Sequence, residues 1–207
     1  MMILGICCSP RKGGTTAEAM ALCLSAAREA VPGAETRLVE LAELDVRGCI
    51  ACGRCRGSLA CSQEDDLSRT ILPALAQPGV AAIVVGTPVY FGSMTSQCKA
   101  LLDRTVPLRR NGFRLRGVVG GVLAVGGVQH GGQQLAIQTV QAALLCHDMV
   151  VVSDGQPTAH FGAALWSGGA GGITGDAAGR ETARNLGRRV AEVARDLSAG
   201  RSGARPA

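Results

Sequence analysis

Aromatic residues are scarce in this sequence of 207 residues, since one Trp, one Tyr and three Phe make up 2% of it. So few rings argue against a protein that stacks nucleic-acid bases on aromatic side chains. Hydrophobic runs are also short: the longest, such as 80–85, fall far below the roughly 20 residues of a membrane-spanning helix. The first residues, MMILGICCSP, lack the basic start of a signal peptide and predict a strand instead. We therefore expect a cytoplasmic protein without nucleic-acid or membrane partners.

Charged residues contribute only 18% of the chain and leave a mild net charge of +5, which suits an anionic ligand. Hydrophobic residues contribute 47%, which is enough to bury the core of one domain. We expect residues 1–198 to form that domain, with an insert at 47–66. The last residues, 199–207, are polar and contain glycine, so we expect a flexible tail there.

Short apolar segments alternate with helical patterns along the chain. Strands are expected at 2–8, 35–41, 80–86, 118–125 and 149–152. Helices are expected at 15–30, 66–76, 95–105, 133–146 and 177–197, the first with Thr15 or Thr16 as its N-cap. This alternation predicts an α/β fold with a doubly wound, five-stranded parallel sheet, whose ligands bind beyond the carboxyl ends of the strands. Segment 162–179 contains seven glycines, so we expect a loop at the mouth of the ligand site or at an interface.

The turn after the first expected strand has the composition of a phosphate-binding site. It places hydroxyls, two cations and unpaired backbone amides at a helix N-terminus, where the helix dipole also attracts anions. Neither the Walker A pattern nor Gly-x-Gly-x-x-Gly is present, and a hydroxyl-rich turn suits one terminal phosphate better than a pyrophosphate. The alternative is a capped helix with two solvated cations. The candidate phosphate ligands are Ser9, Arg11, Lys12, Gly14, Thr15 and Thr16.

Two further turns follow the third and fourth expected strands. The first holds the only Tyr and one of the three Phe, which favours a flat ligand packed against the rings. The alternative is a loop tucked down by its own aromatics. In the second, His130 has the chemistry to bind a polar ligand edge or move a proton, although a lone loop histidine is more often simply exposed. The candidate residues are Pro88, Val89, Tyr90, Phe91, Gly92 and Ser93, then Gly126, Gly127, His130 and Gly131.

Nine cysteines fall into two groups. Five lie in apolar stretches, where a cysteine behaves as a small hydrophobe: Cys7, Cys8, Cys23, Cys98 and Cys146. The other four follow the compact pattern Cys-x2-Cys-x2-Cys-x5-Cys and are candidate metal ligands, because a reducing compartment disfavours disulfides: Cys49, Cys52, Cys55 and Cys61. Structural zinc usually takes two separated cysteine pairs, whereas a tight triplet is typical of iron–sulfur proteins. A four-iron cluster is therefore favoured, with zinc and unliganded redox-active thiols as the alternatives.

These motifs together resemble those of the iron–sulfur flavoproteins, a branch of the flavodoxin-like NAD(P)H-dependent FMN reductase superfamily. The likeness extends from position 2 to about 197 and differs where the family often has Asn instead of Gly13 and Thr15, and Glu instead of Gln134. Three segments carry it: 9–16, the four cysteines with Asp65-Asp66, and 86–91 with Lys99 and Asp103-Arg104. The resemblance implies FMN at the carboxyl edge of the sheet, a [4Fe–4S] cluster on the insert, and a homodimer or homotetramer.

The resemblance and the motifs together predict an enzyme, a flavin-dependent oxidoreductase that passes electrons between FMN and one-electron carriers. NAD(P)H as donor, a ferredoxin-like carrier and a small-molecule acceptor are the expected partners. No side chain has to act as a nucleophile, so we name no catalytic residue. The first alternative is an NAD(P)H-dependent FMN or quinone reductase with structural or vestigial cysteines. The second is a zinc-stiffened binding or sensor module.

Overall fold

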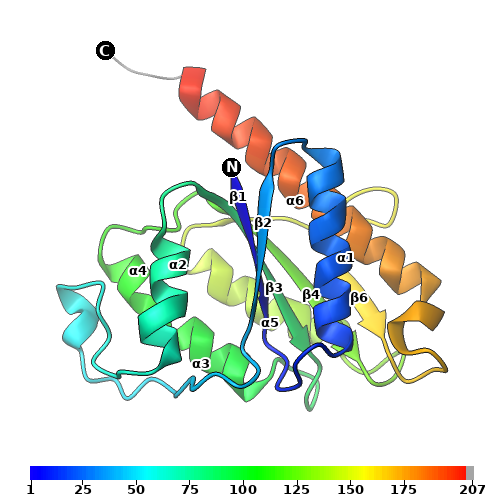
Figure 1. Ribbon diagram of the computed structural model, residues 1–207, viewed down its shortest axis with the longest axis horizontal. Helices are drawn as coiled ribbons and strands as arrows, with labels where there is room; N and C mark the ends of the chain where they lie inside the picture. The colour runs from blue at the N-terminus through cyan, green and yellow to red at the C-terminus, as the bar shows by residue number, and fades with distance from the viewer. Residues whose placement is uncertain (204–207) are drawn as a thin grey trace.

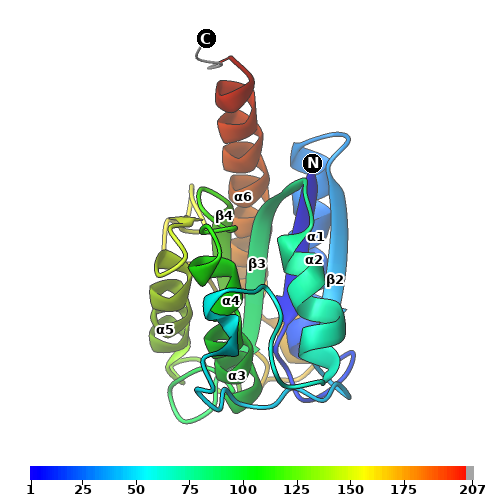
Figure 2. The same ribbon diagram turned by 90° about the vertical axis from the view of Figure 1, so that its left-hand side faces the viewer.

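A parallel β-sheet forms the middle layer of the computed structural model, which describes residues 1–203, and helices cover both of its faces (Figures 1 and 2). The strands are β1 (Met2–Cys7), β2 (Glu35–Glu40), β3 (Val80–Pro88), β4 (Val119–Gly126), β5 (Val150–Val151) and β6 (Ala163–Trp166). All pair in parallel, in the order β2-β1-β3-β4-β5, with β6 also paired to β4. This is the strand order of flavodoxin-like doubly wound sheets, so the expected fold class is confirmed.

Six helices flank the sheet. On one face lie α1 (Thr15–Ala30) and α6 (Ala177–Gly203). On the other lie α2 (Leu72–Ala76), α3 (Ser96–Arg104), α4 (Val106–Arg110) and α5 (Gln133–Leu145). A π-helical turn, Leu67–Ile71, leads into α2, and short 3-10 turns occur at Arg54–Arg56 and Gly172–Gly175.

The fifth strand position is split between two short strands, where a single strand at 149–152 is expected. Strand β5 pairs with the start of β4 (Val119 opposite Val150), and β6 pairs with its end (Leu123 opposite Ala163). The chain leaves the sheet between them. The expectation of a loop throughout 162–179 is therefore wrong for its first residues, because Ala163 and Leu165 are buried in the sheet. Gly162 permits this return, since a Cβ there would lie only 2.4 Å from the carbonyl oxygen of Val122.

Two helix termini also differ from expectation. Helix α1 has the expected bounds, but Gly14 is its N-cap and no side chain caps it, so the expected capping by Thr15 or Thr16 is wrong. Helix α6 passes its expected end at 197 and continues to Gly203, into the expected tail at 199–207. Residues 204–207 of that tail lie outside the described residues.

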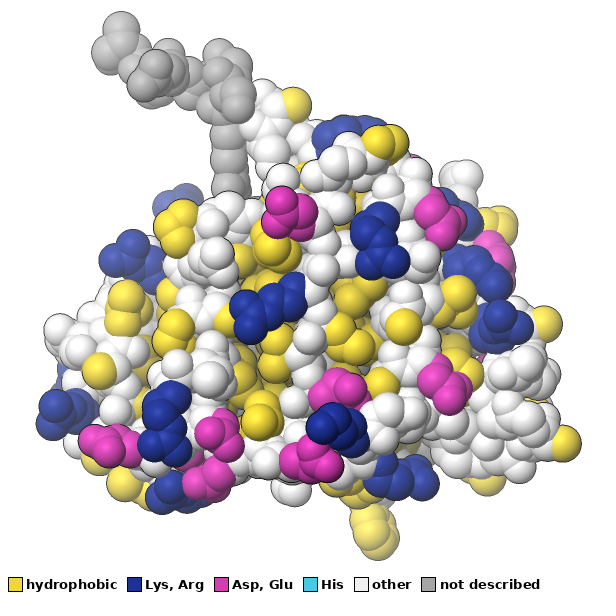
Figure 3. Space-filling model, in the orientation of Figure 1, with side chains coloured by type: hydrophobic (Ala, Val, Ile, Leu, Met, Phe, Trp, Pro, Cys, Tyr) yellow, Lys and Arg dark blue, Asp and Glu magenta, His cyan; other side chains and the backbone are white. Residues whose placement is uncertain are grey.

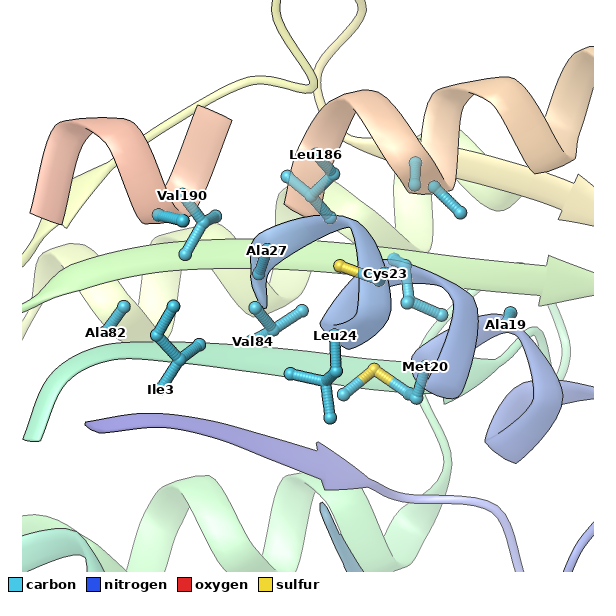
Figure 4. Close-up of a cluster of buried hydrophobic side chains, with 14 of the residues drawn as sticks. Ile3, Ala19, Met20, Cys23, Leu24, Ala27, Ala82, Val84, Leu186 and Val190 are labelled. Atoms are coloured by element: carbon cyan, nitrogen blue, oxygen red, sulfur yellow. The ribbon is translucent and has the colours of Figure 1, made fainter. Parts of the chain in front are cut away.

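The core on the α1 and α6 face consists of small side chains and a few large ones (Figure 4). Met20 and Leu24 of α1 lie over the sheet, and Leu186 of α6 belongs to the same buried cluster. The two helices approach closely: a Cβ on Gly187 of α6 would lie 2.0 Å from the carbonyl oxygen of Cys23. Burial raises the pKa of Cys23 to about 12, so this thiol is a core residue rather than a ligand.

The carboxyl ends of β1, β3 and β4 lie side by side at the lower edge of the sheet in Figure 1. Cys7 is opposite Gly86 and Pro88 is opposite Val125, which brings the following turns together. Charges of both signs are mixed around a hydrophobic middle on the face seen in Figure 3. Within residues 1–203, no helix has the length and apolar character needed to cross a membrane.

Candidate functional site: a sheet-edge region and a cysteine cavity

Hydrogen bonds from one buried threonine and from the residue that follows β3 hold the turns together at the sheet edge. Thr95, the N-cap of α3, donates from Oγ1 to the carbonyl oxygen of Cys8 at 2.8 Å. Its backbone N–H donates to Thr87 Oγ1 at 3.1 Å. The Val89 N–H donates to the carbonyl oxygen of Val125 at 2.9 Å, which ties the second turn to the end of β4. The turns are therefore fixed without a ligand.

The first turn places its predicted residues unequally. The Ser9 hydroxyl is buried and accepts from the Arg11 N–H at 3.1 Å, while the Arg11 side chain is exposed. Lys12 is directed away from the turn into an ion pair with Glu43 at 2.7 Å, and that hydrogen bond raises its pKa. The backbone N–H of Gly13 donates to Glu40 Oε2 at 2.9 Å. A carboxylate thus occupies one amide of the turn that is predicted to bind phosphate.

The start of α1 supplies the remaining predicted phosphate ligands. Gly14 is the N-cap, Thr15 is half-buried, and Thr16 is buried. The glycine-rich segment reaches this point, since a Cβ on Gly172 would lie 3.4 Å from Thr15 Cγ2. The same segment also borders the third turn, where the Ser167 N–H donates to the carbonyl oxygen of Gly126 at 2.9 Å. The segment therefore borders two of the three predicted turns.

The second turn is a tight reversal that projects an aromatic ring. Tyr90 and Ser93 exchange backbone hydrogen bonds of 2.9 and 3.0 Å, and Phe91 and Gly92 have φ angles of +48° and +72°. Phe91 is fully exposed and Tyr90 about half exposed. The alternative of a loop tucked down by its aromatics is therefore wrong for these rings. A left-handed backbone at a Phe is uncommon and here keeps the ring at the tip of the turn.

The third turn is held by a residue that the sequence analysis did not single out. Gln133 is buried and donates from Nε2 to the carbonyl oxygens of Val128 at 2.7 Å and Leu165 at 3.3 Å. The Gln133 side chain has room only because residue 126 is a glycine, since a Cβ at that position would lie 2.3 Å from Nε2. Gly127 and Gly131 complete the turn, and His130 is exposed beside it. The signal was a Gln at the start of a helix directly after a glycine-rich turn.

The second and third turns also touch each other. A Cβ on Gly132 would lie 3.0 Å from the Cα of Gly92, so the two turns approach backbone to backbone. His130 lines a neighbouring cavity of about 610 Å³ together with Trp166. The sheet edge therefore joins all three predicted turns into one region, with Lys12 as the candidate directed away from it.

The four predicted metal ligands lie in a separate region, on the loop between β2 and the π-helical turn. All four line one cavity of about 490 Å³, whose other wall is formed by α3 and α4. Two of the thiols are exposed and two half-buried, as expected for a surface site: Cys49, Cys52, Cys55 and Cys61. Among residues 1–203, no three His, Cys, Asp or Glu side chains converge closely enough to hold a single metal ion.

Hydrogen-bond donors point at the sulfurs of this cavity. Arg110 donates from Nη1 to Cys55 Sγ at 3.0 Å, and Arg104 donates from Nη2 to Cys61 Sγ at 3.4 Å. The N–H of Ala51 donates to Cys49 Sγ at 3.5 Å. Three of the four sulfurs therefore each accept a hydrogen bond from an N–H group.

The remaining sulfur, Cys52 Sγ, shares a hydrogen bond of 2.9 Å with Ser62 Oγ. This bond is the main cause that lowers the pKa of Cys52, and a hydrogen bond from the Arg54 backbone adds to it. Every one of the four sulfurs therefore has a polar hydrogen partner.

A buried ion pair closes the base of the cysteine loop. Arg104 of α3 is 1% exposed and Asp65 is 0% exposed, and two guanidinium nitrogens donate to the carboxylate. Nη1 also donates to the carbonyl oxygen of Arg47 at 3.0 Å, and Nη2 to that of Gln63 at 3.4 Å. One side chain thus holds both the entry and the exit of the loop.

The charges of this pair are fixed by their contacts. Burial alone would raise the pKa of Asp65, but the hydrogen bonds from Arg104 and from the Arg47 and Ser68 backbones hold it well below its usual range. The Asp65 carboxylate in turn raises the pKa of Arg104. Both residues belong to the motifs behind the family resemblance, but their pairing across 39 positions could not be read from the sequence.

A second residue holds the tip of the loop. Asn111, directly after α4, donates from Nδ2 to the carbonyl oxygens of Cys55 at 3.1 Å and Ser58 at 2.9 Å. Helix α3 begins at the sheet-edge turns and ends at Arg104, so its nine residues connect the two regions. At 1.5 Å per residue this corresponds to about 13 Å.

Comparison with known proteins agrees with this geometry. The sequence pattern of the NADPH-dependent FMN reductase family matches residues 1–164. An iron-sulfur flavoprotein of Methanocaldococcus jannaschii is 41% identical over 193 residues, which cover 93% of this chain and 97% of that protein. The chain belongs to the iron–sulfur flavoproteins of this FMN reductase family. A further iron-sulfur flavoprotein, from Methanosarcina thermophila, is 38% identical over 186 residues, covering 90% and 93% of the two chains.

Family membership establishes the general chemistry. The iron–sulfur flavoproteins belong to an FMN reductase family, so this chain is a flavin-dependent oxidoreductase and its flavin is FMN. A solved structure, the flavodoxin WrbA-like protein from Agrobacterium tumefaciens, has a TM-score of 0.64 at 20% identity and covers 94% of this chain and 98% of its own. That likeness shows the fold and independently supports the flavodoxin-like topology.

Proposed function

We propose that this oxidoreductase carries FMN at the sheet edge and one [4Fe–4S] cluster at the cysteine cavity, and passes electrons between them. The observation that carries the proposal is the cavity lined by all four predicted cysteines, each with a polar partner at its sulfur. Flavin exchanges electrons either in pairs or singly, and the cluster exchanges them one at a time, so the two together would connect two-electron and one-electron reactions.

The cysteine residues fit a cluster better than a single zinc ion. Zinc–sulfur bonds of about 2.3 Å in a tetrahedron place the thiolates less than about 4 Å apart. No three cysteines within the described part of the chain converge in this way, although the four line a shared cavity of about 490 Å³. A cluster spreads its thiolate ligands around a larger body, and hydrogen bonds to sulfur are among the features that set its potential.

The turns at the sheet edge offer separate places for the phosphate and for the ring system of FMN. We assign the phosphate to the first turn, where the Ser9 hydroxyl and the amides at the start of α1 meet the exposed Arg11. We assign the ring system to the second and third turns, beside Tyr90 and Phe91. Backbone N–H groups of these turns would stabilise negative charge on the reduced ring, without any nucleophilic side chain.

The partners are part of the proposal. We propose a homodimer or homotetramer, NAD(P)H or a ferredoxin-like protein as electron donor, and a small-molecule acceptor. A cytoplasmic location fits the nine cysteines, all unpaired, because a reducing compartment keeps thiols free.

One measurement tests the two-cofactor proposal: iron, acid-labile sulfide, zinc and released flavin per chain in protein purified without oxygen. We expect about four irons, four sulfides and one FMN. FMN with neither iron nor sulfide would support a simple NAD(P)H-dependent FMN or quinone reductase, which would then oxidise NAD(P)H when depleted of iron. Zinc without FMN would support the binding or sensor module and contradict the sheet-edge assignment.

A further inference from the structure

The cations around the cysteine cavity differ in how they are neutralised. Arg104 lies 3.4 Å from Cys61 Sγ, but its charge is balanced by Asp65 in the buried pair. Asp103, on the same wall, is paired with Lys99. Each of these two pairs is close to neutral in sum and changes the electrostatic potential at the sulfurs little.

Arg110 is a cation of this cavity whose charge is not balanced within an ion pair. Its Nη1 donates to Cys55 Sγ at 3.0 Å, and within residues 1–203 its guanidinium forms no ion pair with a carboxylate. Arg56 also lines the cavity without an ion pair, but it donates to none of the four sulfurs. Arg110 therefore combines a full uncompensated charge with direct contact to a ligand atom.

We propose that Arg110 sets the reduction potential of the group held by the four cysteines, through its hydrogen bond to Cys55. This inference rests on the proposed function, because it requires a redox group at the cavity. Reduction adds one negative charge to that group, and a cation donating to one of its sulfurs stabilises the reduced state more than the oxidised state. Arg110 raises the potential for this reason and makes the group easier to reduce.

The neighbouring residue provides a matched control. Arg109 lies on the same short helix and carries the same charge, but its guanidinium donates to the carbonyl oxygen of Cys146 and lies 5.3 Å above the Phe113 ring. It contacts no cysteine sulfur of the loop. Comparing Arg109→Gln with Arg110→Gln separates the loss of a positive charge near the cavity from the loss of the bond to sulfur.

The test is a potentiometric titration of the two variants and the wild type, purified without oxygen and followed by absorbance and electron paramagnetic resonance. We expect Arg110→Gln to disfavour reduction about tenfold, a shift of roughly 59 mV to more negative potential for one electron. Arg109→Gln should shift it much less. Arg110→Lys keeps the charge without the planar fork and should fall between the wild type and Arg110→Gln.

Iron and sulfide contents separate this inference from the function on which it rests. Wild-type protein without iron and sulfide overturns both. Protein that holds iron but shows the same potential in Arg110→Gln as in the wild type overturns the role of Arg110 alone, as do equal shifts in the Arg109 and Arg110 variants. If Arg110→Gln loses its iron, Arg110→Lys decides, and an unshifted potential there counts against the proposal.

Discussion

The sheet-edge turns and the cysteine loop are built in different ways. The turns continue directly from adjacent strands, and backbone hydrogen bonds such as Val89 to Val125 hold them in register. The loop at 47–65 leaves the sheet, and side chains of another part of the chain hold it: Arg104 at its base, Asn111 and Arg110 near its tip. Figure 2 shows this loop, in cyan, beside α3 and α4.

Because of this difference, we expect a substitution in one region to leave ligand binding in the other region unchanged. A turn fixed by the strand ladder keeps its shape as long as the sheet is folded, so it is preorganised for a ligand. A loop held by a few side chains depends on each of them and on the group that it binds. We therefore expect changes in the loop to leave flavin binding intact, and changes in the turns to leave the cluster in place.

The largest expected effect is the loss of the proposed cluster from Cys52→Ala, because this change removes one of its four proposed ligands. FMN should remain bound, since the phosphate turn is a separate element. Iron, sulfide and flavin contents measure both effects, with Cys146→Ala, an exposed cysteine outside the loop, as control. Loss of FMN from a folded Cys52→Ala protein would show that the regions are not independent.

Removing the buried arginine should cost the most stability. Arg104→Met leaves the Asp65 carboxylate buried without its partner, which destabilises proteins by about 3–5 kcal/mol. Urea unfolding of the protein as purified measures this. The double variant Arg104→Met, Asp65→Leu removes both charges and should recover much of the loss. A double variant as unstable as the sum of the two single variants would mean that the ion pair is not the cause.

In the first sheet-edge turn, Arg11→Ala should weaken FMN binding by about 1.5–3 kcal/mol if the guanidinium contacts the phosphate. Flavin fluorescence during titration gives the dissociation constant. Arg37→Ala, which removes an exposed arginine of β2, is the control. An unchanged dissociation constant in Arg11→Ala would identify Arg11 as a solvated surface cation.

The connection between α3 and α4 contains a contact that should make stability depend on pH. His147 Nε2 lies 2.8 Å from Oγ1 of Thr105, the residue between α3 and α4, and that hydroxyl donates to the carbonyl oxygen of Leu102. The imidazole therefore donates from Nε2, and no partner contacts its buried Nδ1 in the described structure. Burial lowers the pKa of His147 below 6.5, and the nearby Arg109 lowers it further.

The lowered pKa of His147 determines the direction in which stability changes with pH. The unfolded chain takes up the proton more readily than the folded one, so the stabilisation is complete above pH 6.5 and is lost as the pH falls below it. The free energy of unfolding should decrease there by at most about 1.4 kcal/mol per pH unit from this group. His147→Gln keeps a donor near Thr105 and should reduce the slope between pH 6.5 and 5. Equal slopes in the wild type and His147→Gln would assign the effect to other groups.

The smallest effect, with the opposite sign to that of Arg11→Ala, concerns the carboxylate on the phosphate turn. Glu40 accepts from the Gly13 N–H, and its charge opposes an incoming phosphate. Glu40→Gln should tighten FMN binding roughly fivefold, equivalent to about 1 kcal/mol of repulsion between exposed charges. Glu35→Gln, at the other end of the same strand, is the control. Weaker binding in Glu40→Gln would show that the carboxylate supports the turn instead of competing with the ligand.

Local patterns in the sequence were enough to predict most of the sheet. Helix α1 has its expected bounds, and β3 was evident as a β-branched run, because strong periodicity and turn-forming residues mark both. Strand β6 was missed because glycines surround its four residues and their pairing with β4 determines the strand. Local composition gave no sign that the chain would leave the sheet and return to the same position.

The candidate sites were predictable as sets of residues but not as arrangements. The cysteine spacing alone located the loop that holds the four candidate metal ligands, and turn chemistry located the candidate site at the sheet edge. The ion pair of Arg104 with Asp65, the direction of Lys12 toward Glu43 and the role of Gln133 depend on contacts between distant segments. Such contacts follow from the packed fold, which a single sequence does not display.

The closure of the cysteine loop at its base makes it a transferable unit. One guanidinium holds the residues on both sides of the loop. The positions at which the loop leaves and rejoins the rest of the protein are therefore fixed independently of the residues between them. Loop length and cysteine spacing can then diverge without moving a strand, in the same way that a hypervariable loop diverges on a constant scaffold. To receive the whole module, a related reductase without cysteines would need the loop, its closing aspartate, the arginine on α3 and the counterparts of Arg110 and Asn111 that hold the tip.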